Sequence, residues 1–239
     1  MKIGEFDTEK RVFIIAEAGV NHNGNMSEAY DLIRQAKTAG ADAVKFQCFS
    51  SALFPEPQRS ICKPLELNYD QLQELHGYAK HCGIMWLCTP FDRDAVDFLD
   101  PLVPAFKIGS GQARDMDFVG YVAGKGKPMI LSTGMMKDYR SLPESIKGEF
   151  AILHCVSRYP TPPEMADLTR MNEWRCDGYS DHTKGIEITV AAVALGARII
   201  EKHITLDRTQ AGPDHTSSAE PRQFADMVRM IRNVEKAIK

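Results

Sequence analysis

Two histidines near the end of the chain, His182 and His203, each close an apolar run. Residues 186–195 between them have the pattern of a helix, so the histidines stand one strand–helix unit apart. Parallel strands joined in this way end on the same side of a sheet, and both imidazoles are therefore expected on one rim. Imidazole nitrogens are good ligands for divalent metals, so the spacing favours a shared metal ion.

The other expected strand ends also carry groups that hold charge or donate hydrogen bonds. They are Glu17, Lys45, Gln47, Thr89, Lys107, Ser110, Ser132, Thr133, His154, Ser157, Tyr159 and Ser180. Each residue alone has an ordinary explanation, such as a solvated lysine or a hydrogen-bonded histidine. The joint pattern favours an active site, because random strand ends would include several apolar residues.

Two of these residues are lysines within apolar surroundings. Strand alternation places Lys45 and Gln47 on the same inward face, and apolar residues flank Lys107 on both sides. A buried lysine without a nearby anion is costly. Both ammonium groups are therefore expected to face a negative partner.

Hydroxyl groups of Ser110, Ser132 and Ser180, with nearby glycine amides, would complete a site for a phosphate-bearing carboxylate. The alternative is that the lysines pair with barrel acids such as Glu17 or Glu201. Glu17 follows an apolar strand, and it could be a counter-ion or a group that moves a proton.

A TIM barrel is the predicted fold. Expected strands cover 12–17, 42–47, 84–88, 105–108, 129–131, 151–155 and the two runs that end at the histidines. Expected helices cover 27–39, 69–82, 93–99, 115–123, 140–146, 164–174, 186–195 and 221–238, with Ser27 as an N-cap and Gly40 as a stop.

Eight strand–helix units of about 30 residues suit an α/β protein with a closed (β/α)8 barrel. We expect one domain over residues 1–239, with no C-terminal domain after the last helix. The alternative is a doubly wound open sheet, but residues 18–24 lack its glycine-rich phosphate fingerprint.

Composition is that of an ordinary soluble protein. Hydrophobic residues make up 44% of the 239 residues and charged residues 26%, and the net charge is −3. Basic runs are short, which argues against a nucleic-acid surface. No stretch approaches a membrane span or a signal-peptide core, and the six scattered cysteines suit reduced thiols, so a cytoplasmic location is expected.

In these motifs the chain resembles the sialic acid synthase family, which condenses phosphoenolpyruvate with an amino-sugar aldehyde. The matching stretches are residues 15–24, 44–47, 89–91, 106–111, 131–135, 159–162, 180–183, 201–203 and 212–214. The resemblance implies a TIM barrel with a catalytic manganese or magnesium ion, small-molecule substrates and pairing into homodimers.

The resemblance also implies roles for individual residues. His182 and His203 look like the metal ligands, and Glu17, Lys45 and His182 like catalytic groups. The phosphoenolpyruvate pocket would be formed by Lys45, Thr89, Lys107, Ser110, Ser132, Ser157, Tyr159 and Ser180. Acceptor contacts would come from Gln47, Gln112 and Asp214, although Asp214 could equally be a simple turn acid.

The chain departs from the family on the acceptor side. Gln112 stands where members usually carry a glutamate that contacts sugar hydroxyls, and residues 49–67 form a shorter segment than usual. The antifreeze-like domain of typical members is not expected here. These departures suggest a different or looser acceptor. A catalytically reduced barrel that binds phosphoenolpyruvate or a sugar acid, and a metal-dependent pyruvate aldolase, are the competing hypotheses.

Overall fold

The structure is a computed structural model that describes residues 1–136, 146 and 148–238. Its strands are β1 Lys2–Ile3, β2 Phe6–Asp7, β3 Phe13–Gly19, β4 Ala43–Cys48, β5 Met85–Pro90, β6 Phe106–Ile108, β7 Met129–Ser132, β8 Phe150–Cys155, β9 Gly178–Asp181 and β10 Ile199–His203. Its α-helices are α1 Met26–Thr38, α2 Gln58–Cys62, α3 Tyr69–Cys82, α4 Arg93–Leu99, α5 Met116–Ala123, α7 Pro163–Ala166, α8 Thr169–Glu173, α9 Glu187–Ala194 and α10 Pro221–Ala237.

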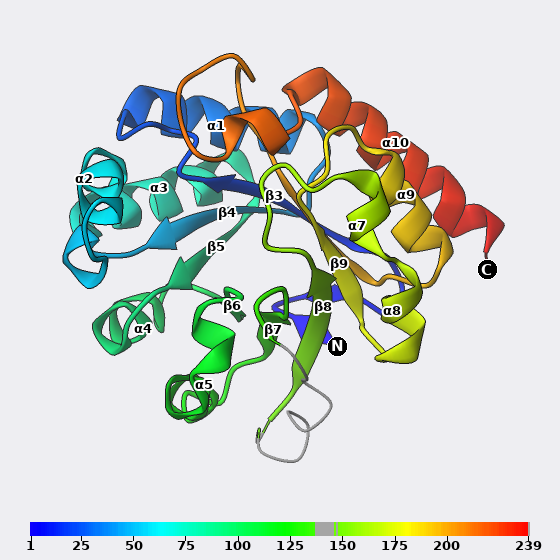
Figure 1. Cartoon of the computed structure of the whole chain (residues 1–239), viewed down its shortest axis with the longest axis horizontal. Coiled ribbons are helices and arrows are strands. Elements are labelled where there is room, and N and C mark those ends of the chain that lie inside the picture. The colour runs from blue at the N-terminus through cyan, green and yellow to red at the C-terminus, as the bar shows by residue number, and fades with distance from the viewer. Residues whose placement is uncertain (137–145, 147, 239) are drawn as a thin grey trace.

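Strands β3 to β10 form one parallel sheet that curves into a nearly closed barrel, and the long helices lie outside it (Figure 1). The hydrogen-bonded order is β5-β4-β3-β10-β9-β8-β7-β6, so the first strand of the barrel, β3, pairs with the last, β10. This arrangement confirms the predicted TIM barrel, and the open-sheet alternative is wrong.

Inward-facing residues change from apolar to polar along each strand. The lower interior, toward the amino-terminal ends of the strands, is a small apolar cluster that includes Phe13, Ile15, Leu87, Leu153 and Ile199. Outward residues of the strands pack against the helices in a second, larger core. The period-2 alternation of strands therefore leaves the upper interior for polar side chains.

An N-terminal hairpin of β1 and β2 covers the lower end of the barrel. Ile3 is fully buried in the lower apolar cluster, and the ring of Phe6 lies 4.8 Å from that of Phe13. Sequence patterns did not predict this hairpin, because strands of two residues are too short to show alternation.

Most predicted elements are confirmed with boundary shifts of one or two residues, and α3 and α4 match their predicted ranges. The predicted helix over 164–174 is wrong as a single element: it is divided into α7 and α8 at Asp167, which has a left-handed backbone with φ 43°. The predicted helix over 140–146 lies, except for Ile146, outside the described residues. Among the described residues, no helix combines the length and apolar character that crossing a membrane requires.

The predicted N-cap of α1 was wrong by two residues. Asn25, not Ser27, is the cap, and its side-chain oxygen accepts a hydrogen bond from the Ser27 backbone N–H at 2.9 Å. Helix α1 therefore begins at Met26.

We expect Asn25→Ala to lower the free energy of unfolding by about 1 kcal/mol, because a backbone donor at the helix start loses its acceptor. The matched variant Ser27→Ala should change it by less than about 0.5 kcal/mol, since Ser27 is exposed and only its backbone takes part. Urea denaturation of both variants measures the difference, and equal losses would contradict the assignment of Asn25.

Candidate active site

A cavity of about 440 Å³ lies at the carboxyl ends of the barrel strands. It brings together most of the residues predicted for the site, namely Glu17, Lys45, Gln47, Thr89, Lys107, Ser110, Gln112, Ser132, Ser157, Tyr159, Ser180, His182 and His203. Asp214 does not line it, and the strand-end residues Thr133 and His154 line a separate cavity instead. The lining also includes residues that the sequence analysis did not assign to the site: Phe54, Phe91, Gly109, Gly111, Met135, Cys155 and Glu201.

Lys45 lines the cavity and is buried. Its Nζ is 2.7 Å from Oε2 of Glu17 and donates a hydrogen bond to the hydroxyl of Thr89 at 2.8 Å. Burial acts to lower the pKa of Lys45, but the charges of Glu17 and Glu201 outweigh it and raise that pKa. The Lys45 side chain is therefore held as an ammonium ion.

Glu201 connects the two lysines. Its Oε2 lies 3.6 Å from Nζ of Lys45, and its Oε1 lies 3.5 Å from Nζ of Lys107. Lys107 also donates to the hydroxyl of Ser132 at 2.8 Å, and Ser180 donates to Oε1 of Glu201 at 2.8 Å. The alternative considered from the sequence, pairing of the lysines with Glu17 and Glu201, is the arrangement seen here.

Glu201 lines the cavity, although the sequence pattern indicated only a counter-ion for the lysines at this position. Burial acts to raise its pKa, but Lys107, Lys45 and the Ser180 hydroxyl hold that pKa well below the ordinary value. Alternation along β10 places it on the same face as His203, and this spacing could have identified it.

The pKa of Glu17 is shifted in the opposite direction from that of Glu201. Burial raises its pKa to about 7, although Lys45 acts to lower it. The side-chain amide of Gln47 donates to Oε1 of Glu17 at 3.1 Å. A carboxyl group with a pKa near neutrality can both give and take a proton, which suits general acid–base work.

Ser110 lies in a tight corner of the cavity. Its hydroxyl oxygen accepts from the Gly134 backbone N–H at 3.1 Å and lies 3.2 Å from Sγ of Cys155. A Cβ on Gly134 would come within 2.5 Å of that sulfur and 2.6 Å of the Ser157 hydroxyl. Glycine is therefore required for the backbone N–H to approach this closely.

His182 is fixed by hydrogen bonds at both ring nitrogens. Nδ1 lies 2.7 Å from the carbonyl oxygen of Val156 and must donate to it, so Nε2 carries the lone pair that accepts from the Tyr159 hydroxyl at 2.8 Å. Burial lowers the pKa of His182. The ring is therefore neutral, in the state that binds metals.

His203 faces His182, with 5.6 Å between the ring centroids. Its pKa is lowered well below the ordinary value, chiefly by burial and then by His182. Nδ1 of His203 is buried without a hydrogen-bond partner among the described residues, and Asp214 Oδ2 lies 3.7 Å away. Asp214 thus lies next to His203, although it does not line the cavity.

The two histidines fit a divalent cation on this chemistry. Both rings are neutral and converge, and one has an unsatisfied buried nitrogen. Within the described part of the chain, no group of three or more His, Cys, Asp or Glu side chains is arranged to hold a metal. An ion with two protein ligands would keep open positions for water or substrate.

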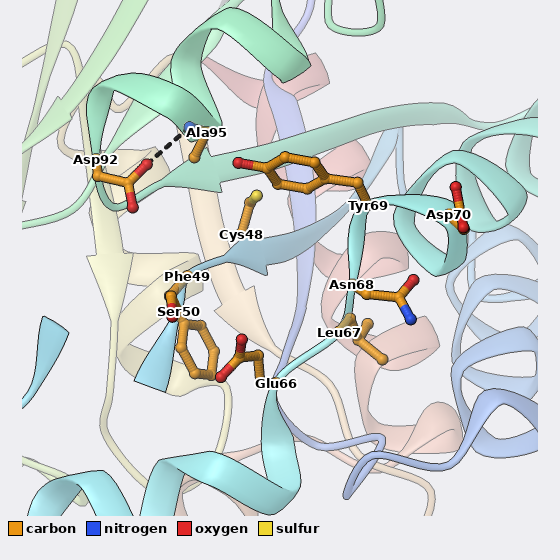
Figure 2. Close-up of a pocket in the computed structure, with 10 residues that line it drawn as sticks. All are labelled: Cys48, Phe49, Ser50, Glu66, Leu67, Asn68, Tyr69, Asp70, Asp92 and Ala95. Atoms are coloured by element: carbon orange, nitrogen blue, oxygen red, sulfur yellow. Dashed lines mark hydrogen bonds between the residues drawn. The ribbon is translucent and has the colours of Figure 1, made fainter. Parts of the chain in front are cut away.

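Aromatic rings form one wall of the cavity. Phe54 and Phe91 line it, and both rings lie within 5.8 Å of the ring of Phe49 behind them. Phe49 in turn lines a second cavity of about 470 Å³, whose carboxylates include Glu66 and Asp92 (Figure 2).

Polar side chains that line the second cavity cap helices and a turn. Asp92 accepts from the Ala95 N–H, Glu66 accepts from the Ser51 N–H, and Asn68 caps α3. The carboxylates of Asp92 and Glu66 therefore have structural roles, and we assign no chemistry to this cavity.

A model of the NeuB family matches residues 32–239. The chain belongs to the NeuB family. It is 40% identical to a mouse N-acetylneuraminate-9-phosphate synthase, over 95% of this chain and 71% of the relative. It is 39% identical to an N,N'-diacetyllegionaminic acid synthase of Campylobacter jejuni, over 96% of this chain and 78% of the relative.

Solved structures agree with this assignment. An N-acetylneuraminic acid synthetase from Leptospira borgpetersenii, crystallised with citrate, superposes with a TM-score of 0.92 at 35% identity and covers 100% of this chain and 89% of the other. The predicted resemblance to sialic acid synthases is therefore confirmed for this member of the NeuB family.

The raised pKa of Glu17 predicts a pH dependence of stability. The folded chain keeps this proton up to about pH 7, whereas an unfolded glutamate releases it near its ordinary value of 4.5. The folded state therefore binds more protons between these values, and this group's contribution to the free energy of unfolding falls as pH rises. We expect Glu17→Gln to lose less stability than the wild type between pH 4.5 and 7.

Urea denaturation at several pH values measures both slopes. The control is Glu164→Gln, because Glu164 is exposed on α7. Its slope should equal that of the wild type. A Glu17→Gln slope indistinguishable from the wild type would show that the pKa of Glu17 is not raised in the folded protein.

Proposed function

We propose that this protein is a nonulosonic acid synthase, which condenses phosphoenolpyruvate with the open-chain aldehyde of N-acetylmannosamine or a related amino sugar. The observation that carries the proposal is the placing of two buried ammonium groups and two neutral imidazoles in one cavity. The names of the mouse and Campylobacter relatives support the same product class. The substrates are small molecules, and the cytoplasm is the proposed compartment.

Phosphoenolpyruvate would occupy the part of the cavity around Lys45 and Lys107. These ammonium groups, with the hydroxyls of Ser132 and Thr89 that already bond them, match the charge of a phosphate and a carboxylate. Fixed donors in a buried site need little reorganisation during reaction, so they stabilise charge effectively. Ser110, Ser157, Tyr159 and Ser180 would complete the pocket.

His182 and His203 would hold Mn²⁺ or Mg²⁺. When bound, the cation would act as a Lewis acid toward the carbonyl oxygen of the acceptor. The fixed tautomer of His182 makes its Nε2 available for this role once the Tyr159 hydroxyl moves aside.

The proposed reaction forms one carbon–carbon bond. Carbon 3 of phosphoenolpyruvate attacks the aldehyde carbon, water adds at carbon 2, and phosphate leaves with cleavage of its bond to carbon 2. Glu17, whose pKa lies near 7, would take the proton from the entering water or return one to the acceptor oxygen. Holding both substrates in line supplies much of the acceleration.

The acceptor would lie toward the mouth, near Gln47, Gln112 and the aromatic wall of Phe54 and Phe91. Asp214, which lies next to His203 and does not line the cavity, would act on acceptor hydroxyls through a shift of its loop or through water. A neutral amide at position 112 makes weaker hydrogen bonds to sugar hydroxyls than a carboxylate would. We therefore propose a looser acceptor requirement than in relatives with glutamate there.

Phosphate release tests the function directly. The protein with Mn²⁺ and phosphoenolpyruvate should release phosphate only when an amino-sugar aldehyde is added, and mass spectrometry should find the nine-carbon acid. Carbon–carbon bond formation from pyruvate without phosphate release would instead support an aldolase. Binding of phosphoenolpyruvate without turnover on any aldehyde would support a non-catalytic barrel.

We expect Lys107→Met to lower kcat/KM for phosphoenolpyruvate by about 100-fold or more, because a fixed cation is removed from a buried anion site. The matched control is Lys80→Met on the exposed face of α3, which should retain wild-type kinetics. A Lys107→Met enzyme within threefold of the wild type would contradict the placement of phosphoenolpyruvate.

A further inference from the structure

A buried ion pair lies directly behind the two histidines. Asp181 precedes His182 and Lys202 precedes His203, and the two charged residues are paired opposite one another in the register of β9 and β10. Their side chains are fully buried, with 0% exposure. Strand alternation turns the histidines into the cavity and this pair outward. Helix α9 packs against β9 and β10 on the outside of the barrel (Figure 1).

Lys202 bonds to both neighbours of His182. Its Nζ donates to Oδ2 of Asp181 at 2.9 Å and to the carbonyl oxygen of Thr183 at 2.5 Å. One side chain on β10 therefore holds the backbone of His182 from the residue before it and from the residue after it.

Asp181 connects the segment around His182 to helix α9 outside the barrel. Its Oδ1 accepts from the Thr183 N–H at 2.9 Å, and its Oδ2 accepts from the hydroxyl of Thr189 on α9 at 2.5 Å. The carbonyl of His182 itself accepts from the Thr161 N–H at 2.8 Å. The segment around His182 lies beyond the end of β9, where one isolated bridge between Thr161 and Thr183 remains. The side-chain bonds of Asp181 and Lys202 therefore supply most of what fixes it.

A gain in stability does not by itself explain why this ion pair is buried. Removing two charges from water is expensive, and buried ion pairs are often replaced by apolar residues without loss of stability. Burial acts to lower the pKa of Lys202, against the charge of Asp181. The pair instead fixes one geometric quantity, the position of His182 relative to His203 on the neighbouring strand.

We propose that Lys202 and Asp181 are positioning residues that hold His182 at the distance and orientation from His203 that a divalent cation requires. This inference rests on the proposed function, in which both imidazoles bind that cation. It assigns a role to two residues that touch neither substrate nor the cavity.

The test variant is the double substitution Lys202→Met with Asp181→Asn, which removes both charges and nearly preserves volume. The matched control is Arg232→Met with Asp42→Asn, a second cross-element ion pair at 2.6 Å beside the amino-terminal end of β4. We expect isothermal titration to show Mn²⁺ affinity lowered about 10- to 100-fold in the test variant and unchanged in the control.

Two further measurements separate positioning from general damage. Affinity for phosphoenolpyruvate in metal-free protein should stay within threefold of the wild type, because Lys45 and Lys107 do not contact the pair. Nitrogen-15 NMR of the imidazoles in metal-free protein should show altered resonances for His182. Where the double variant does not fold, Thr189→Val, with Thr189→Ser as its control, removes one bond to Asp181 and should weaken Mn²⁺ binding measurably.

A folded variant that binds Mn²⁺ like the wild type overturns the positioning role, as do unchanged His182 resonances. A wild-type protein that binds no Mn²⁺ at millimolar concentration overturns the cation site itself. The NMR comparison needs no metal, so it decides between these two failures.

Discussion

A network of two buried lysines and two buried glutamates is the constraint on which this structure depends. Lys45 and Lys107 face Glu17 and Glu201 across the upper interior of the barrel, at 2.7 to 3.6 Å. A single uncompensated charge there would cost several kcal/mol, so removing any member affects the others. The network also explains why carboxyl groups on neighbouring strands have opposite pKa shifts: Glu201 is shared by both lysines, and Glu17 is bonded by only one.

The division of the barrel interior supports this network. The apolar lower half and the hairpin beneath it supply the packing that fixes the strands, and the strands then fix the charges above. Functional groups carried on strands are held more precisely than groups on loops. All four members of the network, Glu17, Lys45, Lys107 and Glu201, are carried on strands in this way.

Much of this arrangement could be predicted because alternation and residue type carry it. Eight apolar runs ending in polar residues indicate a barrel with a polar rim. The spacing of His182 and His203 indicates that their rings lie close together. Contacts between elements distant in sequence could not be predicted. The pairing of Asp181 with Lys202 depends on a neighbouring strand, and the break at Asp167 depends on a left-handed backbone angle. The Asn25 cap is a local contact, but residue type did not distinguish Asn25 from Ser27, since both are favoured N-cap residues.

The barrel has one seam. Strands β5 and β6 lie next to one another but form no hydrogen-bonded ladder among the described residues. Lys45 is tied to Thr89 on β5, and Lys107 on β6 is tied to Ser132 on β7. A dianion bound by both lysines would therefore connect Lys45, which is bonded to β5, with Lys107 on β6, across the gap where the backbone forms no hydrogen bonds. The ligand would then close the ring of strands, and its binding to the folded chain would stabilise the barrel against unfolding.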